Sequence, residues 1–428
     1  MTDLAYREDP AGRDAVPAAA DIGHGVRPVP RISLQAFCES PDLVAAIEAA
    51  AADRRMARAH VKVQTGGISA ATEFYQVAAT PNLIIVETHL PRERLDAELD
   101  RLAEVCDAGT KLVVIGQVND VELYRSLIQR GISEYLVAPV GLPDIIRTVA
   151  DLYVDRSTQP LGRTIAFVGG KGGVGSSMVA HNVAWSIART LASDVVIADL
   201  DLAFGTAGLD FNQDPAQGIA EAVGAPERLD DNFLDRLLAH CSDNLSLLAA
   251  PATLDRTYDL AEGAFEPVID VAQAGVPTVV LDIPHVWTAW AKKTLLAADE
   301  IVITVEPDLA NLRNAKSLVD LLRAARPNDK LPRLVMNKVG MARRPEIKAD
   351  EFASAVNLKP LALIPFDAQL FGTAANNGQM IAETDAKSPI AESFDVIART
   401  VTGRAEVRRS KRGLLSPLLA RFGGKKTA

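Results

Sequence analysis

A glycine-rich segment near the middle of the chain carries the residue types that bind phosphate. Gly170 and Gly175 are separated by four residues, and Ser176 and Ser177 follow directly. Glycines let the backbone turn so that successive N–H groups point at one anion, and the hydroxyl of the second serine suits Mg²⁺. The segment expected to contact a nucleotide consists of Gly170, Lys171, Gly172, Gly173, Val174, Gly175, Ser176 and Ser177.

The segments on either side of this loop predict the elements that position it. The apolar run 164–168 is typical of a buried strand, and apolar residues from Val179 to Leu191 recur at helical spacing. A strand, a glycine loop and a helix in this order put the loop at a helix N-terminus, where the helix dipole also favours an anion. We therefore expect a phosphate loop rather than a turn without a ligand.

One position departs from the usual phosphate-loop pattern. That pattern has a lysine where this chain has Ser176, whereas a lysine occurs early in the loop, at Lys171. Serine can form a hydrogen bond but cannot neutralise the charge that develops during phosphoryl transfer. By analogy with the removal of an oxyanion-hole donor, this loss costs about 10²–10³ in rate. The sequence predicts nucleotide binding with slow or absent hydrolysis.

Other predicted strands of the same domain end in polar residues. Asp199 and Asp201 follow the run 195–198, and Asp282 ends another apolar run. Ligands of doubly wound sheets bind at the carboxyl ends of the strands, so these carboxylates are expected at one crevice. A carboxylate after an apolar run is costly unless it is exposed or engaged by a cation, which makes Asp282 a candidate for holding the water shell of Mg²⁺.

The segment Lys171-Gly-Gly-Val-Gly-Ser-Ser resembles the deviant phosphate loop (deviant Walker A) of the ParA/MinD family of dimerising ATPases. The resemblance implies ATP and Mg²⁺ as cofactors, and a homodimer in which Lys171 reaches the partner's nucleotide. It implies that Asp201 orients the attacking water, that Asn337 reads the adenine and that the turn at Pro365 covers the base. The residues implied around the metal are Ser177, Asp201 and Asp282.

Residues 30–154 predict another α/β domain, because short apolar runs alternate with helical segments. Their order resembles a response-regulator receiver domain. The residues that receivers use for phosphotransfer are replaced: Glu87 stands at the acceptor position, Gly116 at the hydroxyl position and Ala138 at the lysine position, with 37–39 in place of the acidic pair. We interpret this domain as a pseudo-receiver, an interaction module without phosphotransfer, and expect Glu87 to be partly exposed and solvated.

The fold class predicted for the whole chain is α/β, with two doubly wound parallel-sheet domains. A receiver-like, flavodoxin-type fold is followed by a ParA/MinD-type phosphate-loop ATPase domain. The expected boundaries are a disordered leader over 1–29, the pseudo-receiver over 30–154, a linker over 155–162, the nucleotide-binding domain over 163–403 and a basic amphipathic tail over 404–428.

Composition limits the function classes. The formal net charge of −10 argues against a general nucleic-acid surface, and we expect no specific nucleic-acid partner. Cys38, Cys106 and Cys241 form no metal or redox motif, and the single cysteine of the central domain is too few for an iron–sulfur cluster. We find neither a secretory leader nor a run of about 20 apolar residues, and expect a cytoplasmic protein.

Two further segments, 199–211 and 284–290, together with the pseudo-receiver, resemble the CpaE/TadZ proteins of tight-adherence, Flp-type pilus systems. The resemblance implies a polar localisation factor that helps place the pilus secretion machinery. With the phosphate loop and Ser176, we expect an ATP-binding dimer that has at most a weak ATPase activity. Two alternatives stay open: an inactive pseudo-ATPase scaffold, and a MinD-like membrane-associated positioning ATPase for another polar complex. Trp287 and Trp290 are interpreted as core rather than interface residues.

The C-terminal segment 404–428 combines eight basic residues and one acid with leucines that a helix would gather on one face. It resembles the membrane-targeting helix of MinD. The resemblance implies peripheral binding to an anionic membrane surface, at the inner face of the cytoplasmic membrane. A solvated tail is the alternative, because Pro417 shortens any helix.

Overall fold

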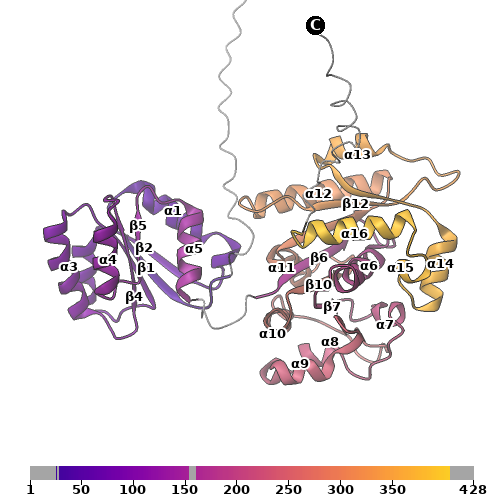
Figure 1. The fold of residues 1–428 in the computed structure, drawn as a ribbon, viewed down its shortest axis with the longest axis horizontal. Coiled ribbons are helices and arrows are strands. Elements are labelled where there is room, and N and C mark those ends of the chain that lie inside the picture. Colours follow the sequence, from indigo (N-terminus) through magenta and orange to yellow (C-terminus); the bar gives the residue numbers. More distant parts are fainter. Residues whose placement is uncertain (1–25, 27, 154–160, 405–428) are drawn as a thin grey trace, which may run out of the picture. The chain divides into compact units, whose positions relative to one another are not determined.

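The computed structural model describes residues 26, 28–153 and 161–404 and divides into two compact units (Figure 1). Unit 1 comprises Met1–Gln159 and Leu322–Lys330, and unit 2 comprises Pro160–Leu321 and Leu331–Ala428. The predicted leader lies almost wholly outside the described residues. The same holds for most of the predicted linker and for the basic tail after Arg404.

Unit 1 contains a five-stranded parallel sheet in the order β2-β1-β3-β4-β5. This is the strand order of flavodoxin-type doubly wound folds, as predicted. The strands are β1 (Ser33–Cys38), β2 (His60–Thr65), β3 (Leu83–Glu87), β4 (Lys111–Gly116) and β5 (Glu134–Val137).

Helices cover both faces of this sheet (Figure 1). Successive strand residues point to opposite faces, so Leu83 and Ile85 pack with α1 and α5, whereas Ile84 and Val86 pack with α2, α3 and α4. The helices are α1 (Pro41–Ala51), the 3₁₀ helix η1 (Arg54–Met56), α2 (Ile68–Tyr75), α3 (Arg92–Val105), α4 (Val121–Gln129) and α5 (Leu142–Tyr153).

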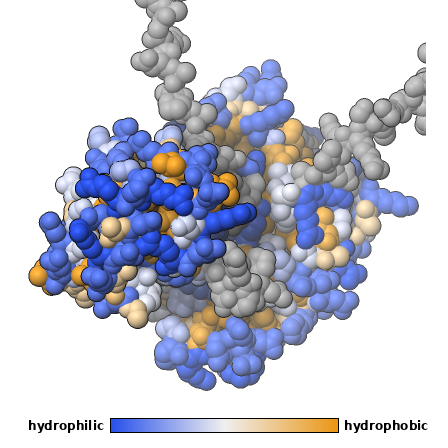
Figure 2. All heavy atoms as spheres, turned by 60° about the vertical axis from the view of Figure 1, so that its left-hand side comes forward, coloured by the Kyte–Doolittle hydropathy of each residue, from blue (hydrophilic) through white to orange (hydrophobic). Residues whose placement is uncertain are grey.

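The forward part of Figure 2 shows a largely hydrophilic surface with small, separate hydrophobic patches. One set of exposed apolar side chains in unit 1 lies along α4. Val121, Tyr124 and Ile128 are 63%, 39% and 37% exposed, and their spacing of three and four residues puts them on one face of the helix. We call these three residues the α4 face.

Unit 2 contains an eight-stranded sheet in the order β13-β12-β11-β6-β10-β7-β9-β8. The strands expected over 164–168, over 195–198 and up to Asp282 are present as β6, β7 and β10. The sequence did not predict β8, which pairs antiparallel with β9 at the edge. The strands are β6 (Arg163–Gly169), β7 (Val195–Asp199), β8 (Ala239–Ser242), β9 (Leu245–Leu248), β10 (Thr278–Ile283), β11 (Glu300–Val305), β12 (Arg333–Val339) and β13 (Pro360–Pro365).

The helix that follows the phosphate loop, α6 (Ser176–Arg189), is buried in the core of unit 2. Val183 and Ile187 of α6 pack with Phe394 and Ile397 of α16 in one cluster. The other helices are α7 (Ala207–Asp210), α8 (Ile219–Gly224), the 3₁₀ helix η2 (Pro226–Arg228), α9 (Asp231–Leu237), α10 (Glu266–Gly275), α11 (Ala289–Ala297), α12 (Leu309–Ala325), α13 (Ala349–Val356), α14 (Ala368–Asn377), α15 (Ile381–Thr384) and α16 (Pro389–Val401). Among the described residues, no helix is long and apolar enough to span a membrane.

Candidate functional site

The phosphate loop joins β6 to α6 and has the backbone that its glycines predict. β6 ends at Gly169 and α6 begins at Ser176. Gly173 and Gly175 have positive φ angles of 80° and 85°, which residues with a Cβ rarely adopt. A Cβ at Gly175 would also lie 2.6 Å from Nδ2 of Asn337. Position 175 therefore requires glycine for two reasons: its φ angle is positive, and a Cβ would clash with Asn337.

Backbone N–H groups of the loop are available to an anion. Ser176 and Ser177 begin α6, a 14-residue helix whose positive end adds to these donors. The hydroxyl of Ser176 is buried and has no hydrogen-bond partner in the described part of the chain. The N–H groups without a partner among the described residues include those of Gly172, Gly173, Gly175, Ser176 and Ser177. Successive backbone N–H groups without a protein partner are typical of a nest, a concavity that suits an anion.

Three side chains hold the loop through its carbonyl oxygens. Nδ2 of Asn337 donates to the carbonyl of Val174 at 2.8 Å, and Nζ of Lys338 donates to the carbonyl one residue earlier at 2.6 Å. Nδ2 of Asn314 donates to the carbonyl of Gly170 at 2.8 Å. The C=O and N–H of a trans peptide point in opposite directions. These bonds therefore also orient the N–H groups of the loop.

Asn337 and Pro365, expected around an adenine, lie at the ends of neighbouring strands. Asn337 is 1% exposed, and its Oδ1 accepts a hydrogen bond from the N–H of Lys338 at 2.9 Å. Both ends of its amide are therefore engaged within the protein. Pro365 is exposed and is in register with Val339 of β12. Contact of Asn337 or Pro365 with a base stays a prediction.

Sequence reasoning missed Lys338. Its ammonium lies 2.8 Å from Oε1 of Glu306, and the other oxygen of that carboxylate lies 2.7 Å from Nη1 of Arg344. The structure thus places a cation on the phosphate loop although position 176 carries serine. In the sequence, Lys338 is only a lysine that follows Asn337. The sequence does not show that the end of β12 lies beside the phosphate loop, and the contact depends on this.

Lys171 lies on an exposed part of the loop. Its ammonium is 3.4 Å from Oδ2 of Asp308, and 48% of its side chain is exposed. Burial raises the pKa of the Asp308 carboxyl, but hydrogen bonds from Asn311 and the charge of Lys171 outweigh burial and lower it. An exposed ion pair contributes only about 0–1 kcal/mol, so the lysine can exchange Asp308 for another anionic partner. Its action across a dimer stays a prediction.

Asp199 and Asp282 form a buried pair of carboxylates. They are in register on the adjacent strands β7 and β10, so their side chains point to the same face of the sheet. They are 1% and 4% exposed. Burial, followed by the charge of Asp282, raises the pKa of Asp199 to about 7. Such a pair needs a cation nearby.

His181 of α6 supplies this cation, and sequence reasoning missed it. Its Nδ1 lies 2.7 Å from Oδ2 of Asp210, and its Nε2 lies 3.3 Å from Oδ2 of Asp282. Burial lowers the pKa of His181, but the hydrogen bond to Asp210 and the nearby negative charge of Asp282 outweigh burial and raise it to about 10. The side chain is therefore an imidazolium at neutral pH. In the sequence it is a single histidine among apolar helix residues, without a recognisable motif.

The residues expected around Mg²⁺ lie at the carboxyl ends of three adjacent strands. Ser177 follows β6, Asp282 lies in β10 and Asp201 follows β7, in the sheet order β6-β10-β7. Oδ1 of Asp201 accepts a hydrogen bond from the N–H of Phe204 at 3.0 Å and so stabilises a turn. Oδ1 of Asp282 is buried without a hydrogen-bond partner among the described residues.

The pseudo-receiver differs from the prediction at Glu87. Its side chain is 4% exposed rather than solvated. The carboxylate accepts hydrogen bonds from the N–H of Glu39 at 2.7 Å, and from the N–H and hydroxyl of Ser40 at 2.8 and 2.7 Å. A Cβ at Gly116 would lie 2.4 Å from the hydroxyl of Tyr135, which takes the space of a side chain there. Glu87 therefore has a structural role, as an acceptor for the turn before α1.

The two tryptophans after β10 lie in different environments. Trp290 is 8% exposed and packs edge-on against Phe265, with ring centroids 4.9 Å apart. Trp287 is 55% exposed and lines a cavity of about 390 Å³ beside Gly169 and Gly170. The core interpretation is confirmed for Trp290 and wrong for Trp287.

Comparisons with known proteins agree with this fold and loop. No family model matches the chain. A ParA family ATPase from Chlorobium tepidum has a similar structure, with 24% identity, a TM-score of 0.51 and coverage of 56% of this chain and 98% of that one. The septum site-determining protein MinD of Bacillus subtilis is 24% identical over 282 residues, which are 61% of this chain and 99% of that protein.

These likenesses and the phosphate loop define an α/β protein with a ParA/MinD-type ATPase fold. The crystal structure of a pilus assembly protein CpaE from Caulobacter crescentus is 53% identical, with coverage of 30% of this chain and 98% of that one and a TM-score of 0.30. Because this identity extends over nearly the whole of that chain, it shows the family. The chain belongs to the CpaE family of pilus assembly proteins.

Proposed function

We propose that unit 2 binds ATP through the phosphate loop. The observation that carries this proposal is the set of unpartnered N–H groups at 172, 173 and 175–177, at the N-terminus of α6. Fixed amide donors at a helix N-terminus bind phosphate groups. Hydrogen bonds from the side chains of Asn337, Lys338 and Asn314 to carbonyl oxygens of the loop keep these donors in place before a ligand binds. Such preorganisation lowers the entropic cost of binding.

Mg²⁺ fits this site only together with a nucleotide. The described residues contain no group of three or more His, Cys, Asp or Glu side chains that could hold a metal ion. Mg²⁺ in phosphate loops is held by one hydroxyl, phosphate oxygens and water. Ser177 would supply the hydroxyl, and the unpartnered Oδ1 of Asp282 would accept from a bound water. The cation would neutralise phosphate charge, a task that Ser176 cannot perform.

Nucleotide binding would bring two copies of the chain together, with Lys171 directed to the partner's nucleotide. The exposure of Lys171 and its weak pairing with Asp308 support this role. Light scattering with and without Mg·ATP tests it. We expect ATP-dependent dimers of the unmodified chain, and their loss in Lys171→Ala. Lys316→Ala is the matched control, because Lys316 forms a similarly exposed ion pair with Asp320. An ATP-dependent dimer of Lys171→Ala would remove the lysine from this role.

The dimer would act as a localisation and assembly factor for a Flp-type pilus secretion system, with slow or absent hydrolysis. Membership of the CpaE family supports the pilus role. One observation favours the alternative of a pseudo-ATPase scaffold: His181, a cation of the chain itself, already lies beside Asp282 and offsets its charge. Hydrolysis measured with pilus proteins and membranes present separates the two functions, because a scaffold shows no turnover under any of these conditions.

The basic tail 404–428, which lies outside the described residues after Arg404, would attach the dimer to an anionic membrane. One basic amphipathic segment binds weakly, and pairing two tails in a dimer strengthens binding through effective concentration. Sedimentation with anionic liposomes tests this proposal. We expect the full chain to sediment better with Mg·ATP than without it. A chain truncated after Gly403 that sediments equally well would contradict a role for the tail.

A further inference from the structure

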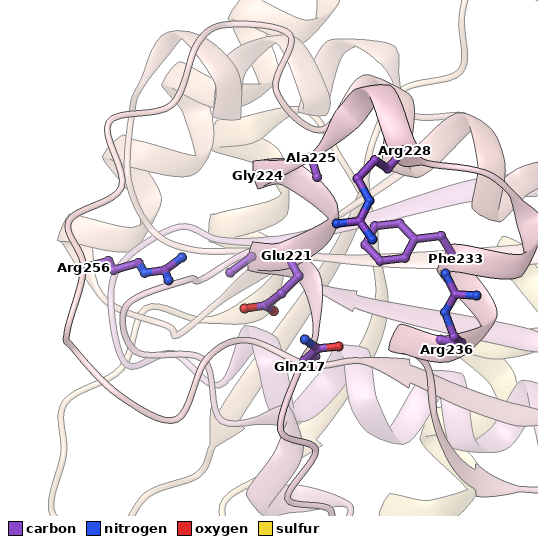
Figure 3. Close-up of a pocket in the computed structure, with 9 residues that line it drawn as sticks. Gln217, Glu221, Gly224, Ala225, Arg228, Phe233, Arg236 and Arg256 are labelled. Atoms are coloured by element: carbon purple, nitrogen blue, oxygen red, sulfur yellow. The ribbon is translucent and has the colours of Figure 1, made fainter.

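A second cavity, of about 340 Å³, lies where α8 and α9 approach the segment that carries Arg256 (Figure 3). Three arginines line it: Arg228, Arg236 and Arg256. No residue of the phosphate loop contributes to its lining. The small side chains of Ala220 and Ala225 also line the cavity.

Phe233 holds two of the three arginines. The guanidinium carbons of Arg228 and Arg236 lie 5.0 and 5.5 Å from the centroid of its ring. Figure 3 shows these two side chains beside the ring, with Arg256 on the opposite side of the view. Stacking uses the flat face of a guanidinium group and leaves the N–H groups at its edge available. Phe233 itself is 8% exposed, so the arginines are held by a ring that is fixed in the core.

The positive charge of this cluster is not neutralised within the described residues. None of the three guanidinium groups forms an ion pair or a hydrogen bond there. Glu221 is the single carboxylate among the lining residues, and its Oε2 accepts a hydrogen bond from the N–H of Gly218 at 2.8 Å. This carboxylate therefore caps the N-terminus of α8 and forms no ion pair with the arginines among the described residues.

Three unpaired guanidinium groups around one concavity match an anion that carries more than one charge. A single carboxylate would leave two of the cations unpaired, whereas a phosphate ester carries about −1.5 to −2 at neutral pH. Guanidinium edges bind phosphate oxygens in pairs, and a site of about 300 Å³ is large enough for a small ligand. We propose that this cavity binds a small phosphate-bearing molecule, at a site separate from the phosphate loop.

Site-resolved arginine modification of the full chain tests the proposal without any substitution. Phenylglyoxal would be applied with and without pyrophosphate, and each arginine followed by peptide mass spectrometry. We expect pyrophosphate to slow modification of Arg228, Arg236 and Arg256, and to leave Arg189, an exposed arginine at the end of α6, unchanged. Equal slowing at all four residues, or no slowing at the first three, would overturn the proposal.

Two further arms identify the ligand class and the site. Protection by citrate without protection by pyrophosphate would replace a phosphate-bearing ligand with a carboxylate and contradict the assignment. Protection must persist in Gly175→Ala, whose phosphate loop is impaired, because its loss there would trace the effect to that loop.

Binding measured by calorimetry gives an independent result. Loss of a charge-assisted hydrogen bond should weaken pyrophosphate binding about tenfold or more in Arg236→Gln, whereas Arg189→Gln should bind like the unmodified chain. This titration is run in the Gly175→Ala background, so that the phosphate loop adds no signal. Thermal unfolding of each variant shows whether a loss of binding reflects a loss of folded protein. Equal affinity of a folded Arg236→Gln variant and its control would overturn the proposal.

Discussion

Nε2 of His181 lies 3.3 Å from Oδ2 of Asp282, so the acid at the end of β10 is paired with a buried cation of the chain itself. The other ring nitrogen is paired with Asp210 after β7. His181 thereby connects α6 to α7, through Asp210, and to β10, through Asp282. It also offsets the charge of two carboxylates that the sheet register forces side by side.

The first prediction concerns the pH dependence of stability. His181 has its pKa raised from 6.5 to about 10 in the folded chain, so between these values the folded state holds a proton that the unfolded state has lost. The free energy of unfolding should therefore fall as pH rises from 6.5 to 10, by at most about 1.4 kcal/mol per pH unit. Below pH 6.5 this contribution is fully present. Urea unfolding, followed by fluorescence at several pH values, measures it.

A matched pair of variants isolates the histidine in that experiment. His181→Gln should lose the slope between pH 7 and 9, above the pKa of about 7 of Asp199 and below the range in which the thiols of Cys38 and Cys241 contribute. His240→Gln, at an exposed histidine of the same unit, should keep the slope. An unchanged slope in His181→Gln would show that another group titrates.

The second prediction concerns the replaced acceptor of the pseudo-receiver. Glu87→Ala leaves two N–H groups and a hydroxyl without their acceptor, which should cost about 3 kcal/mol. Glu87→Gln retains an acceptor oxygen and should cost less. Hydrogen exchange of peptides covering β1 and β3 reports on this unit, since all three tryptophans, at positions 185, 287 and 290, lie in unit 2. Equal exchange in Glu87→Ala and the unmodified chain would contradict the structural role.

The third prediction concerns Ser176. If the missing lysine limits turnover, Ser176→Lys should raise the rate of ATP hydrolysis by about 10²-fold. Ser176→Ala is the control and should leave the rate unchanged, because a serine hydroxyl cannot neutralise the developing charge. A Ser176→Lys variant that binds ATP but hydrolyses it no faster would locate the limitation elsewhere, with the His181–Asp282 pair as the next group to test.

The fourth prediction concerns the α4 face of the pseudo-receiver. Val121→Glu with Ile128→Glu should weaken self-association or binding to a pilus protein, because it places charges on the exposed apolar side chains of this helix. Val77→Glu is the control, since Val77 is 90% exposed on the same unit but lies outside this face. Sedimentation velocity and capture by purified pilus components measure the effect. Equal behaviour of the two variants would exclude the α4 face as a docking surface.

The strands of both sheets were predictable because buried parallel strands leave continuous apolar runs. The strand β8 was missed because it is a short edge strand with polar residues such as His240 and Ser242. The phosphate loop was predictable from glycine spacing. The roles of His181 and Lys338 were not, because each depends on contacts between elements far apart in sequence. The arginine cavity was not predictable for the same reason. Its three arginines form no sequence motif, and two of them are brought together only by contact with the ring of Phe233.

Calorimetric titration of the full chain with Mg·ATP tests the central claim most directly. The unmodified chain should bind with saturation, and Gly175→Ala, which strains the loop and clashes with Asn337, should bind at least about tenfold more weakly. Gly109→Ala is the control, because Gly109 has a φ of 96° with open space around it, and it should bind like the unmodified chain. Absence of saturable binding by the unmodified chain, or equal affinity of Gly175→Ala, would contradict the assignment of the phosphate loop as the nucleotide site.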